Sequence, residues 1–349
     1  MKKQPKAVSL ISGGLDSMLA TKLILDQGVH VEGINFFTGF CVEGHTHAIR
    51  QKDKDKKKRN NALWVAEQLG IKLHIIDVVE PYKEVLINPK HGYGAHLNPC
   101  LDCKVFMVRQ AYEWIHKHDF DFIITGEVVG QRPMSQRKQV MPVVAKESGA
   151  ETLLVRPLSA KNLPMTKPEV EGWIDREKLH GISGRTRKPQ IALAQQYGMD
   201  DFAQPAGGCC FLTDRSYSKK LGDLWGHRGH KDYELDDIML LKVGRHLRPK
   251  ANFKMIIGRE EGENNFMEGY KREFTHMKTV SHVGPLALVD GTLEAGDAHL
   301  AARILARFSQ GKEEKRVDVV LHHKDMAAEG KVISVEPMRE QDVRKDWYV

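Results

Sequence analysis

Residues 6–28, KAVSLISGGLDSMLATKLILDQG, join a short apolar run, a glycine turn and a segment with helical spacing. The run at 6–11 has the length and composition of a buried strand. Leu19, Leu23 and Ile24 repeat on one face of the next segment, which predicts a helix over 17–27. A strand that enters a helix through a glycine turn is typical of the first unit of an α/β fold.

The same alternation continues to about residue 130. Strands are predicted at 29–37, 72–78 and 120–125, and helices at 60–69 and 105–118. This order predicts a doubly wound, mostly parallel sheet with helices on both faces.

The last third of the chain has a different pattern. Apolar runs at 254–258, 286–290 and 317–321 and a helix over 298–308 indicate a smaller α+β domain. A turn cluster precedes residue 216, so we expect two domains, 1–215 and 216–349.

Composition excludes several classes of protein. Of 349 residues, 41% are hydrophobic and 28% are charged, which excludes a disordered, collagen-like or coiled-coil protein. The chain lacks an 18-residue apolar stretch and its first apolar run is too short for a signal peptide. We therefore expect a cytoplasmic protein without a membrane partner. In that compartment, five cysteines favour ligands, catalytic groups or buried thiols over disulfides.

The net charge of +7 is uneven. Residues 1–217 hold 30 Lys+Arg and 24 Asp+Glu, whereas residues 218–349 hold 23 and 22. Seven basic residues fall within 50–59, and Arg185, Arg187 and Lys188 form a second group. These groups are either contacts for a nucleic-acid backbone or ordinary solvated surface.

The glycine turn at residues 12–17, SGGLDS, has the properties of a phosphate-binding loop. Gly13 and Gly14 let backbone N–H groups approach an anion, and the helix that follows presents its positive end. Ser12 and Ser17 add hydroxyl donors, and Asp16 is a candidate ligand for a phosphate-bound metal ion. The spacing matches neither a Walker A loop nor a dinucleotide fingerprint.

Two cysteine-bearing segments are the other chemical signal. Cys100 and Cys103 form a CxxC just before the predicted helix at 105–118, and Cys209 and Cys210 follow a Gly-Gly pair. Three thiolates could hold an iron–sulfur cluster, one cysteine could carry a persulfide that another resolves, or four ligands could hold zinc. Burial as an apolar side chain is the plain alternative and suits Cys41 best.

The SGGLDS turn after the first strand resembles the signature of the PP-loop ATP pyrophosphatases, which have a HUP-like fold. The resemblance implies cleavage of ATP between its α- and β-phosphates, with AMP left on an activated substrate. ATP and Mg²⁺ would be held by Ser12, Gly13, Gly14, Asp16 and Ser17. Gly126, after the fourth strand, would lie near the reacting phosphate, and residues 33–36 would form the adenine pocket.

The CxxC and segments 125–136, 156–160 and 205–209 extend the resemblance to tRNA thiouridine synthases, namely 2-thiouridylases and 4-thiouridine synthetases. This implies a tRNA partner, a sulfur donor that supplies sulfide or a persulfide, and replacement of an adenylated uridine oxygen by sulfur. The implied catalytic residues are Asp16, Cys100, Cys103 and Cys209. The three cysteines would hold a [4Fe-4S] cluster, with Cys210 as the alternative third ligand.

Residues 243–246, 256–259 and Asn264 resemble the RNA-binding module of NFACT proteins. In persulfide-type 2-thiouridylases an aspartate stands in place of Cys100, so the pair Cys100 and Cys103 favours a cluster-dependent enzyme. Two other functions remain open, a PP-loop enzyme that adenylates a small molecule and a non-catalytic RNA-binding protein. The sequence gives neither the modified position nor the oligomeric state.

Overall fold

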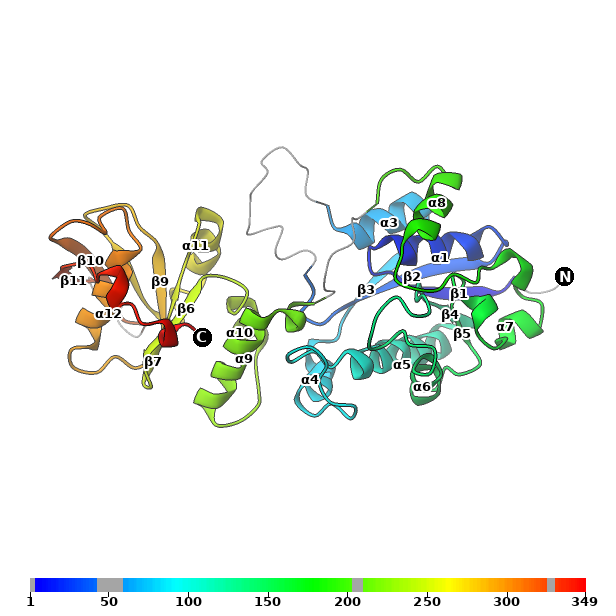
Figure 1. Ribbon diagram of the computed structural model, residues 1–349, viewed down its shortest axis with the longest axis horizontal. Helices are drawn as coiled ribbons and strands as arrows, with labels where there is room; N and C mark the ends of the chain where they lie inside the picture. Colours follow the sequence, from blue (N-terminus) through cyan, green and yellow to red (C-terminus); the bar gives the residue numbers. More distant parts are fainter. Residues whose placement is uncertain (1–3, 43–58, 203–209, 325–329) are drawn as a thin grey trace. The chain divides into compact units, whose positions relative to one another are not determined.

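The computed structural model describes residues 4–42, 59–202, 210–324 and 330–349. Of these, the residues before 214 form one compact unit and those from 214 onward form a second (Figure 1). The division lies two residues before the predicted boundary. The functions predicted for the two domains stay predictions.

The first unit is built on a parallel five-stranded sheet. Its strands are β1 (Lys6–Leu10), β2 (His30–Phe37), β3 (Leu73–Asp77), β4 (Phe122–Ile124) and β5 (Leu154–Val155). They lie in the order β3-β2-β1-β4-β5, and every pairing is parallel. The chain order reverses between β1 and β4, and ligands bind at such a switch point in open α/β sheets. The predicted α/β class is confirmed.

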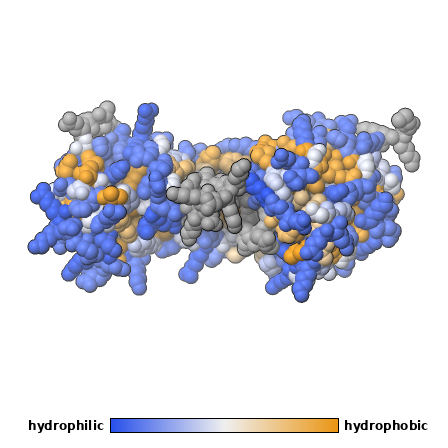
Figure 2. Space-filling view, turned by 90° about the horizontal axis from the view of Figure 1, so that it is seen from above, coloured by the Kyte–Doolittle hydropathy of each residue, from blue (hydrophilic) through white to orange (hydrophobic). Residues whose placement is uncertain are grey.

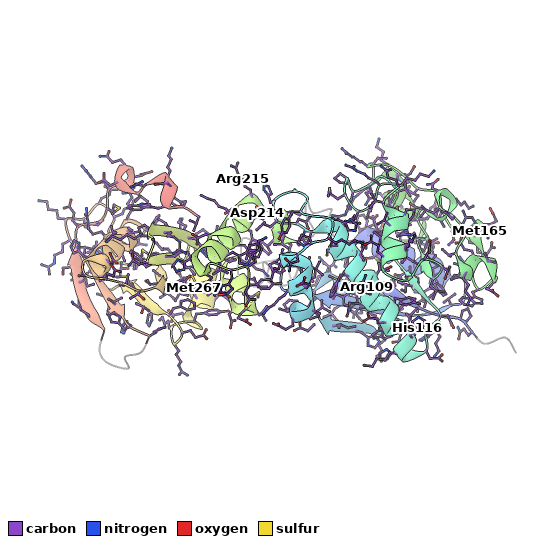
Figure 3. All side chains as sticks on the ribbon, turned by 90° about the horizontal axis from the view of Figure 1, so that it is seen from below. Arg109, His116, Met165, Asp214, Arg215 and Met267 are labelled. Atoms are coloured by element: carbon purple, nitrogen blue, oxygen red, sulfur yellow. The ribbon has the colours of Figure 1, made fainter. Side chains whose placement is uncertain are left out.

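Helices cover both faces of this sheet (Figure 1). One face carries α1 (Leu15–Leu25), α3 (Asn61–Leu69) and α8 (Lys188–Gln196). The other carries α4 (Val79–Ile87), α5 (Cys100–His118) and α6 (Met141–Glu147), and a short α7 (Lys167–Val170) precedes α8. On α5, Arg109 (labelled in Figure 3) donates a 2.7 Å hydrogen bond to the backbone oxygen of Glu147, which joins α5 to the end of α6. Two helical layers around a buried sheet agree with the continuous apolar runs of β1 and β4.

The start of α5 differs from the sequence prediction. The helix begins at Cys100, with Pro99 as its N-cap, so the CxxC lies in its first turn rather than before it. Proline is tolerated at a helix start because its missing N–H would have no intrahelical acceptor there. Both thiols of the CxxC are therefore fixed by a regular helix.

The second unit contains an antiparallel six-stranded sheet in the order β11-β10-β8-β9-β7-β6. Its strands are β6 (Arg245–Lys250), β7 (Phe253–Ile257), β8 (Thr275–Thr279), β9 (Leu286–Gly291), β10 (Val317–His322) and β11 (Lys331–Val335). Its helices are α9 (Arg215–Arg228), α10 (Leu235–Leu240), α11 (Glu261–Glu268) and α12 (Asp297–Arg307). Residues of α12 pack into one apolar core with the sheet, and α10 and α11 contribute to a smaller one. The α+β class predicted for this part is confirmed.

Hydrophilic side chains cover much of the visible surface of each unit, and hydrophobic patches lie among these side chains (Figure 2). None of the helices in the described part of the chain has the length and hydrophobicity needed to cross a bilayer.

Candidate functional site

The glycine turn connects β1 to α1 at the centre of the first sheet. Gly13 has φ of +78°, a left-handed conformation that glycine adopts without strain. Gly14 is the N-cap of α1 and supplies no capping side chain. The Ser17 hydroxyl donates a 2.8 Å hydrogen bond to the Gly14 oxygen, and the Ser12 hydroxyl donates a 3.3 Å hydrogen bond to the Ser17 hydroxyl. The turn thus brings hydroxyl groups and the N-terminus of α1 to one point, an arrangement suited to an anion.

Gly126 brings the segment after β4 into direct contact with this turn. A Cβ atom at Gly126 would lie 2.5 Å from the backbone carbon of Asp16 and 2.5 Å from the Ser17 nitrogen. Real side chains do not approach backbone atoms this closely, so only glycine fits. Gly126, which the resemblance places near the reacting phosphate, therefore contacts the predicted phosphate-binding turn at residues 12–17.

Asp16 lies at the start of α1 with its two carboxylate oxygens in different environments. Oδ2 accepts a 2.5 Å hydrogen bond from the Gln131 amide, whose own oxygen accepts a 2.7 Å bond from Gln190. Oδ1 is buried and has no hydrogen-bond partner among the described residues. A buried carboxylate oxygen without a partner is unfavourable unless a cation or donor occupies the site, so Asp16 fits a Mg²⁺ ligand.

A buried ion-pair network links this region to α5. Glu127 is 2% exposed and accepts hydrogen bonds of 2.9 Å from Arg156 and 3.0 Å from Thr125, with the Lys104 ammonium 3.7 Å away. Burial alone would raise the pKa of Glu127, but Lys104 and Arg156 outweigh it and hold the pKa below its ordinary value. Because Lys104 directly follows Cys103 on α5, this network joins α5 to Glu127, the residue after Gly126.

The cysteines lie at the same end of α5. The Cys100 sulfur is 3.6 Å from the Ser135 hydroxyl, and the Cys210 sulfur is 3.8 Å from the Asn98 side-chain oxygen. Cys100, Cys103 and Cys210 are all half-buried. The segment 126–136 therefore contacts Asp16 through Gly126 and Gln131, and it contacts Cys100 through Ser135.

Cys41 does not fit the interpretation of a buried apolar residue. It is half-buried and forms an isolated antiparallel bridge with Cys210. Sequence patterns did not predict this pairing, because the two residues lie on segments far apart in the chain.

Cys209, one of the predicted cluster ligands, lies outside the described residues. Within the described ranges, no three His, Cys, Asp or Glu side chains are grouped so as to hold a metal ion. The described residues alone therefore do not form a cluster or zinc site. The adenine pocket also stays a prediction: Gly33 lies in the middle of β2, where the Ile11 and Leu73 side chains fill the adjacent space.

One of the two basic groups lies beside the candidate site. Gly184 donates a 2.7 Å backbone hydrogen bond to Val129, within the segment that contains Gly126 and Gln131. Arg185 and Lys188 are exposed, and Arg187 is half-buried at the N-cap of α8. The sequence did not single out Gln190, which follows on α8 and reaches Gln131. Its role depends on contacts between distant segments.

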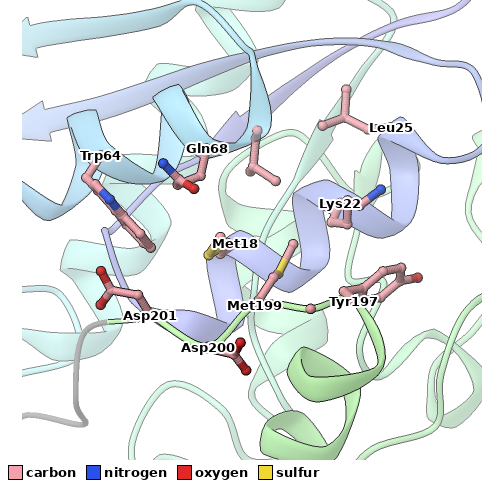
Figure 4. Close-up of a pocket in the computed structure, with 11 residues that line it drawn as sticks. Met18, Lys22, Leu25, Trp64, Gln68, Tyr197, Met199, Asp200 and Asp201 are labelled. Atoms are coloured by element: carbon pink, nitrogen blue, oxygen red, sulfur yellow. The ribbon is translucent and has the colours of Figure 1, made fainter.

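The other basic group, at residues 50–59, is described only at Arg59. Arg59 forms an ion pair with Asp201, which raises its pKa, and its guanidinium carbon lies 3.8 Å from the centre of the Trp64 ring. Asp201 and Trp64 also line a pocket of about 530 Å³ between α1, α3 and the segment after α8 (Figure 4). The pocket includes Met18 but none of the residues 12–17.

Comparison with known proteins identifies the family. The family model described as thiamine biosynthesis protein (ThiI) matches residues 2–176, half of the chain. The chain belongs to the ThiI family. A second model, the NFACT protein RNA binding domain, matches residues 244–348 of this ThiI-family chain.

Several relatives carry names related to tRNA. The tRNA-specific 2-thiouridylase MnmA of Mesoplasma florum is 25% identical over 279 residues, which are 76% of this chain and 69% of that protein. The enzyme of the same name from Treponema denticola is 25% identical over 245 residues, 68% of this chain and 62% of that protein. The chain thus spans about two thirds of the length of these curated relatives.

A solved structure of a 4-thiouridine synthetase–RNA complex with bound ATP is also similar. The aligned region covers 55% of this chain and 50% of the synthetase chain, with 22% sequence identity and a TM-score of 0.34.

Proposed function

We propose that this ThiI-family chain is an ATP-dependent tRNA sulfurtransferase that adenylates a uridine carbonyl and replaces its oxygen with sulfur. One observation carries the proposal. The segment 126–136 touches Asp16 at the phosphate-binding turn and Cys100 at the CxxC helix. Nucleotide activation and sulfur chemistry would then act on the same carbonyl group of the substrate. The names of the relatives support this reaction class.

Activation is assigned to the glycine turn. Ser12, Ser17 and the backbone N–H groups at the start of α1 would bind the pyrophosphate part of ATP, and Asp16 would bind Mg²⁺ through Oδ1. Mg²⁺ offsets the charge that develops on the leaving phosphates. Gln131 would hold the Asp16 carboxylate in position through Oδ2. The uridine oxygen would attack the α-phosphate, release pyrophosphate and become a leaving group as AMP.

Sulfur transfer is assigned to the cysteines around the N-terminus of α5. The predicted [4Fe-4S] cluster would require Cys209 in addition to Cys100 and Cys103, and the described residues do not form its ligand set without Cys209. The cluster therefore stays a prediction, and the thiols alone would carry the sulfur. Iron and sulfide analysis after anaerobic purification tests for the cluster, and zinc without iron would contradict its presence.

The tRNA backbone would contact the exposed cations that follow Gly184. Arg185 and Lys188 lie on a segment hydrogen-bonded to Val129, so phosphates bound there would lie beside the adenylation site. The match of residues 244–348 to an RNA binding domain supports a second contact in the second unit.

Mass spectrometry of nucleosides from a strain that lacks the gene tests the function. We expect one thionucleoside to be missing from its tRNA, and the purified protein, ATP and a sulfide or persulfide source to restore it. An intact set of thionucleosides would contradict the proposal. AMP formation stimulated by a small molecule but not by tRNA would support the alternative of a small-molecule adenylating enzyme.

A further inference from the structure

Two cysteines from distant parts of the chain face each other across a short backbone pairing. Cys41 follows β2, and Cys210 precedes a 3-10 turn at Phe211–Thr213. They are partners in an antiparallel bridge, and the Phe211 nitrogen donates a 2.9 Å hydrogen bond to the Phe40 oxygen.

The position of that hydrogen bond defines the kind of pair. It joins the residue after Cys210 to the residue before Cys41, so the two cysteines are a non-hydrogen-bonded pair. In such pairs the Cα atoms are about 4.5 Å apart and the side chains are close. Disulfides form at Cα separations of roughly 4.4 to 6.8 Å, so this backbone geometry permits a Cys41–Cys210 bond.

The surroundings of both thiols place the pair at the candidate site. The Cys210 sulfur is 3.8 Å from the side-chain oxygen of Asn98, two residues before Cys100. The Cys41 sulfur is 3.6 Å from the Thr38 hydroxyl. Both cysteines are half-buried, so a small sulfur species can reach them while the backbone keeps them opposed.

We propose that Cys41 is the thiol that resolves a persulfide on Cys210, an inference that rests on the function proposed above. A persulfide carrier first converts Cys210 to its persulfide. Cys41, having lost its proton to water, attacks the Cys210 sulfur. The bond to the outer sulfur breaks, and that sulfur leaves with the electron pair as hydrosulfide while a Cys41–Cys210 disulfide forms.

The released hydrosulfide attacks the adenylated uridine carbon and displaces AMP. A dithiol reductant then supplies two electrons and two protons to restore both thiols. Cys41 thus determines when sulfide is released beside the activated base. In the described part of the chain, the Cys41–Cys210 bridge is the backbone pairing that sets two cysteines opposite each other.

Peptide mapping of the full-length protein tests the pairing without any assay of activity. The protein is fully reduced, oxidised with glutathione disulfide, alkylated and digested with trypsin. Cleavage after Lys and Arg yields peptide 23–50 with Cys41, peptide 91–104 with the CxxC, and peptide 188–215 with Cys209 and Cys210. We expect 23–50 to be linked to 188–215, with fragmentation assigning the bond to Cys210.

Variants provide the matched controls. Cys41→Ser should abolish the 23–50 to 188–215 link, whereas Cys100→Ser should leave it in place. A protein in which peptide 23–50 is only alkylated, while 188–215 is linked to 91–104 or within itself, would overturn the pairing.

Sulfide release tests the chemical step. After loading with inorganic polysulfide, Cys41→Ser should keep one extra sulfur on Cys210 and release sulfide at least tenfold more slowly than the unaltered protein. Equal release rates would overturn the resolving role. Failure of the unaltered protein to form AMP with tRNA would instead count against the proposed function, because neither thiol measurement uses ATP or RNA.

Discussion

Replacement of Gly126 by alanine tests the contact between the segment after β4 and the phosphate-binding turn. The new Cβ would lie 2.5 Å from backbone atoms of both Asp16 and Ser17. Carbon atoms prefer separations of about 3.5 Å or more. Because the obstacle is backbone, no change of rotamer relieves the overlap, and the turn must move by roughly 1 Å.

That displacement sets the expected magnitude. Overpacking of a tight site costs about 1 to 3 kcal/mol. Bound nucleotide requires the turn in its original position, so this strain should be expressed as weaker binding. At 1.36 kcal/mol per factor of ten, the affinity for Mg²⁺ and a non-hydrolysable ATP analogue should fall about 5- to 150-fold. A 1 Å error at reacting atoms should lower AMP formation by about a further 100-fold.

Calorimetric titration of Gly126→Ala with the analogue measures the effect, and thermal denaturation monitors the fold. Gly222→Ala is the control, because a Cβ on α9 there would meet nothing within 4 Å. It should leave nucleotide affinity unchanged and stabilise the helix by about 0.5 to 1 kcal/mol. An affinity of Gly126→Ala within twofold of the original would refute the placement of the nucleotide at Asp16 and Ser17, whatever its melting temperature.

Three other substitutions follow from the site. Asp16→Asn should abolish AMP formation because it removes a charged metal ligand. It should not lower the melting temperature, because Asp16 Oδ1 has no hydrogen-bond partner among the described residues. Unchanged Mg²⁺-dependent turnover would contradict this. Glu127→Gln should lower the free energy of unfolding near pH 7 by about 3 to 5 kcal/mol, because a buried cation loses its partner. The pKa of Glu127 is lowered in the folded protein, so the ion pair stabilises the fold less as pH falls below about 4.5. The difference in free energy of unfolding between Glu127→Gln and the unaltered protein, measured by urea denaturation, should therefore shrink in that range. A difference that does not change with pH would argue against the ion pair. Arg185→Glu with Lys188→Glu should weaken tRNA binding and reduce its slope against log salt by about 1.4 to 1.8, measured by fluorescence anisotropy, whereas exposed Lys117→Glu at the far end of α5 should not.

Local sequence patterns were sufficient for β1 to β4 of the first unit's sheet and for the glycine turn, but they did not predict the two-residue β5. A continuous apolar run followed by two glycines specifies β1 and the turn, because only neighbouring residues determine the strand, the left-handed Gly13 and the start of α1. The same local logic located β2, β3 and β4. It placed the start of α5 too late, because the CxxC was interpreted as preceding the helix and not as part of its first turn.

Contacts between distant segments were not predictable in this way. The hydrogen bonds from Gln190 to Gln131 and from Gln131 to Asp16 join three separate segments. Gln190 has no spacing that marks it in a single sequence. The bridge between Cys41 and Cys210 is a second case, because it depends on where two chain segments meet and not on the residues around either cysteine.

The charge distribution bears on how the two units would share an RNA. Residues 218–349 are nearly neutral, and several of their cations are paired within the second unit. Lys254 is buried between Asp223 and Asp290, and Arg248 forms hydrogen bonds of 2.7 and 2.8 Å with Asp223. A cation that already neutralises a carboxylate displaces few counterions from a nucleic acid, so this unit is poorly suited to binding by bulk charge. Any RNA contact it makes should therefore depend on shape and on specific side chains. The salt-dependent part of tRNA affinity should come mainly from the first unit, where exposed Arg185 and Lys188 lie beside the proposed adenylation site.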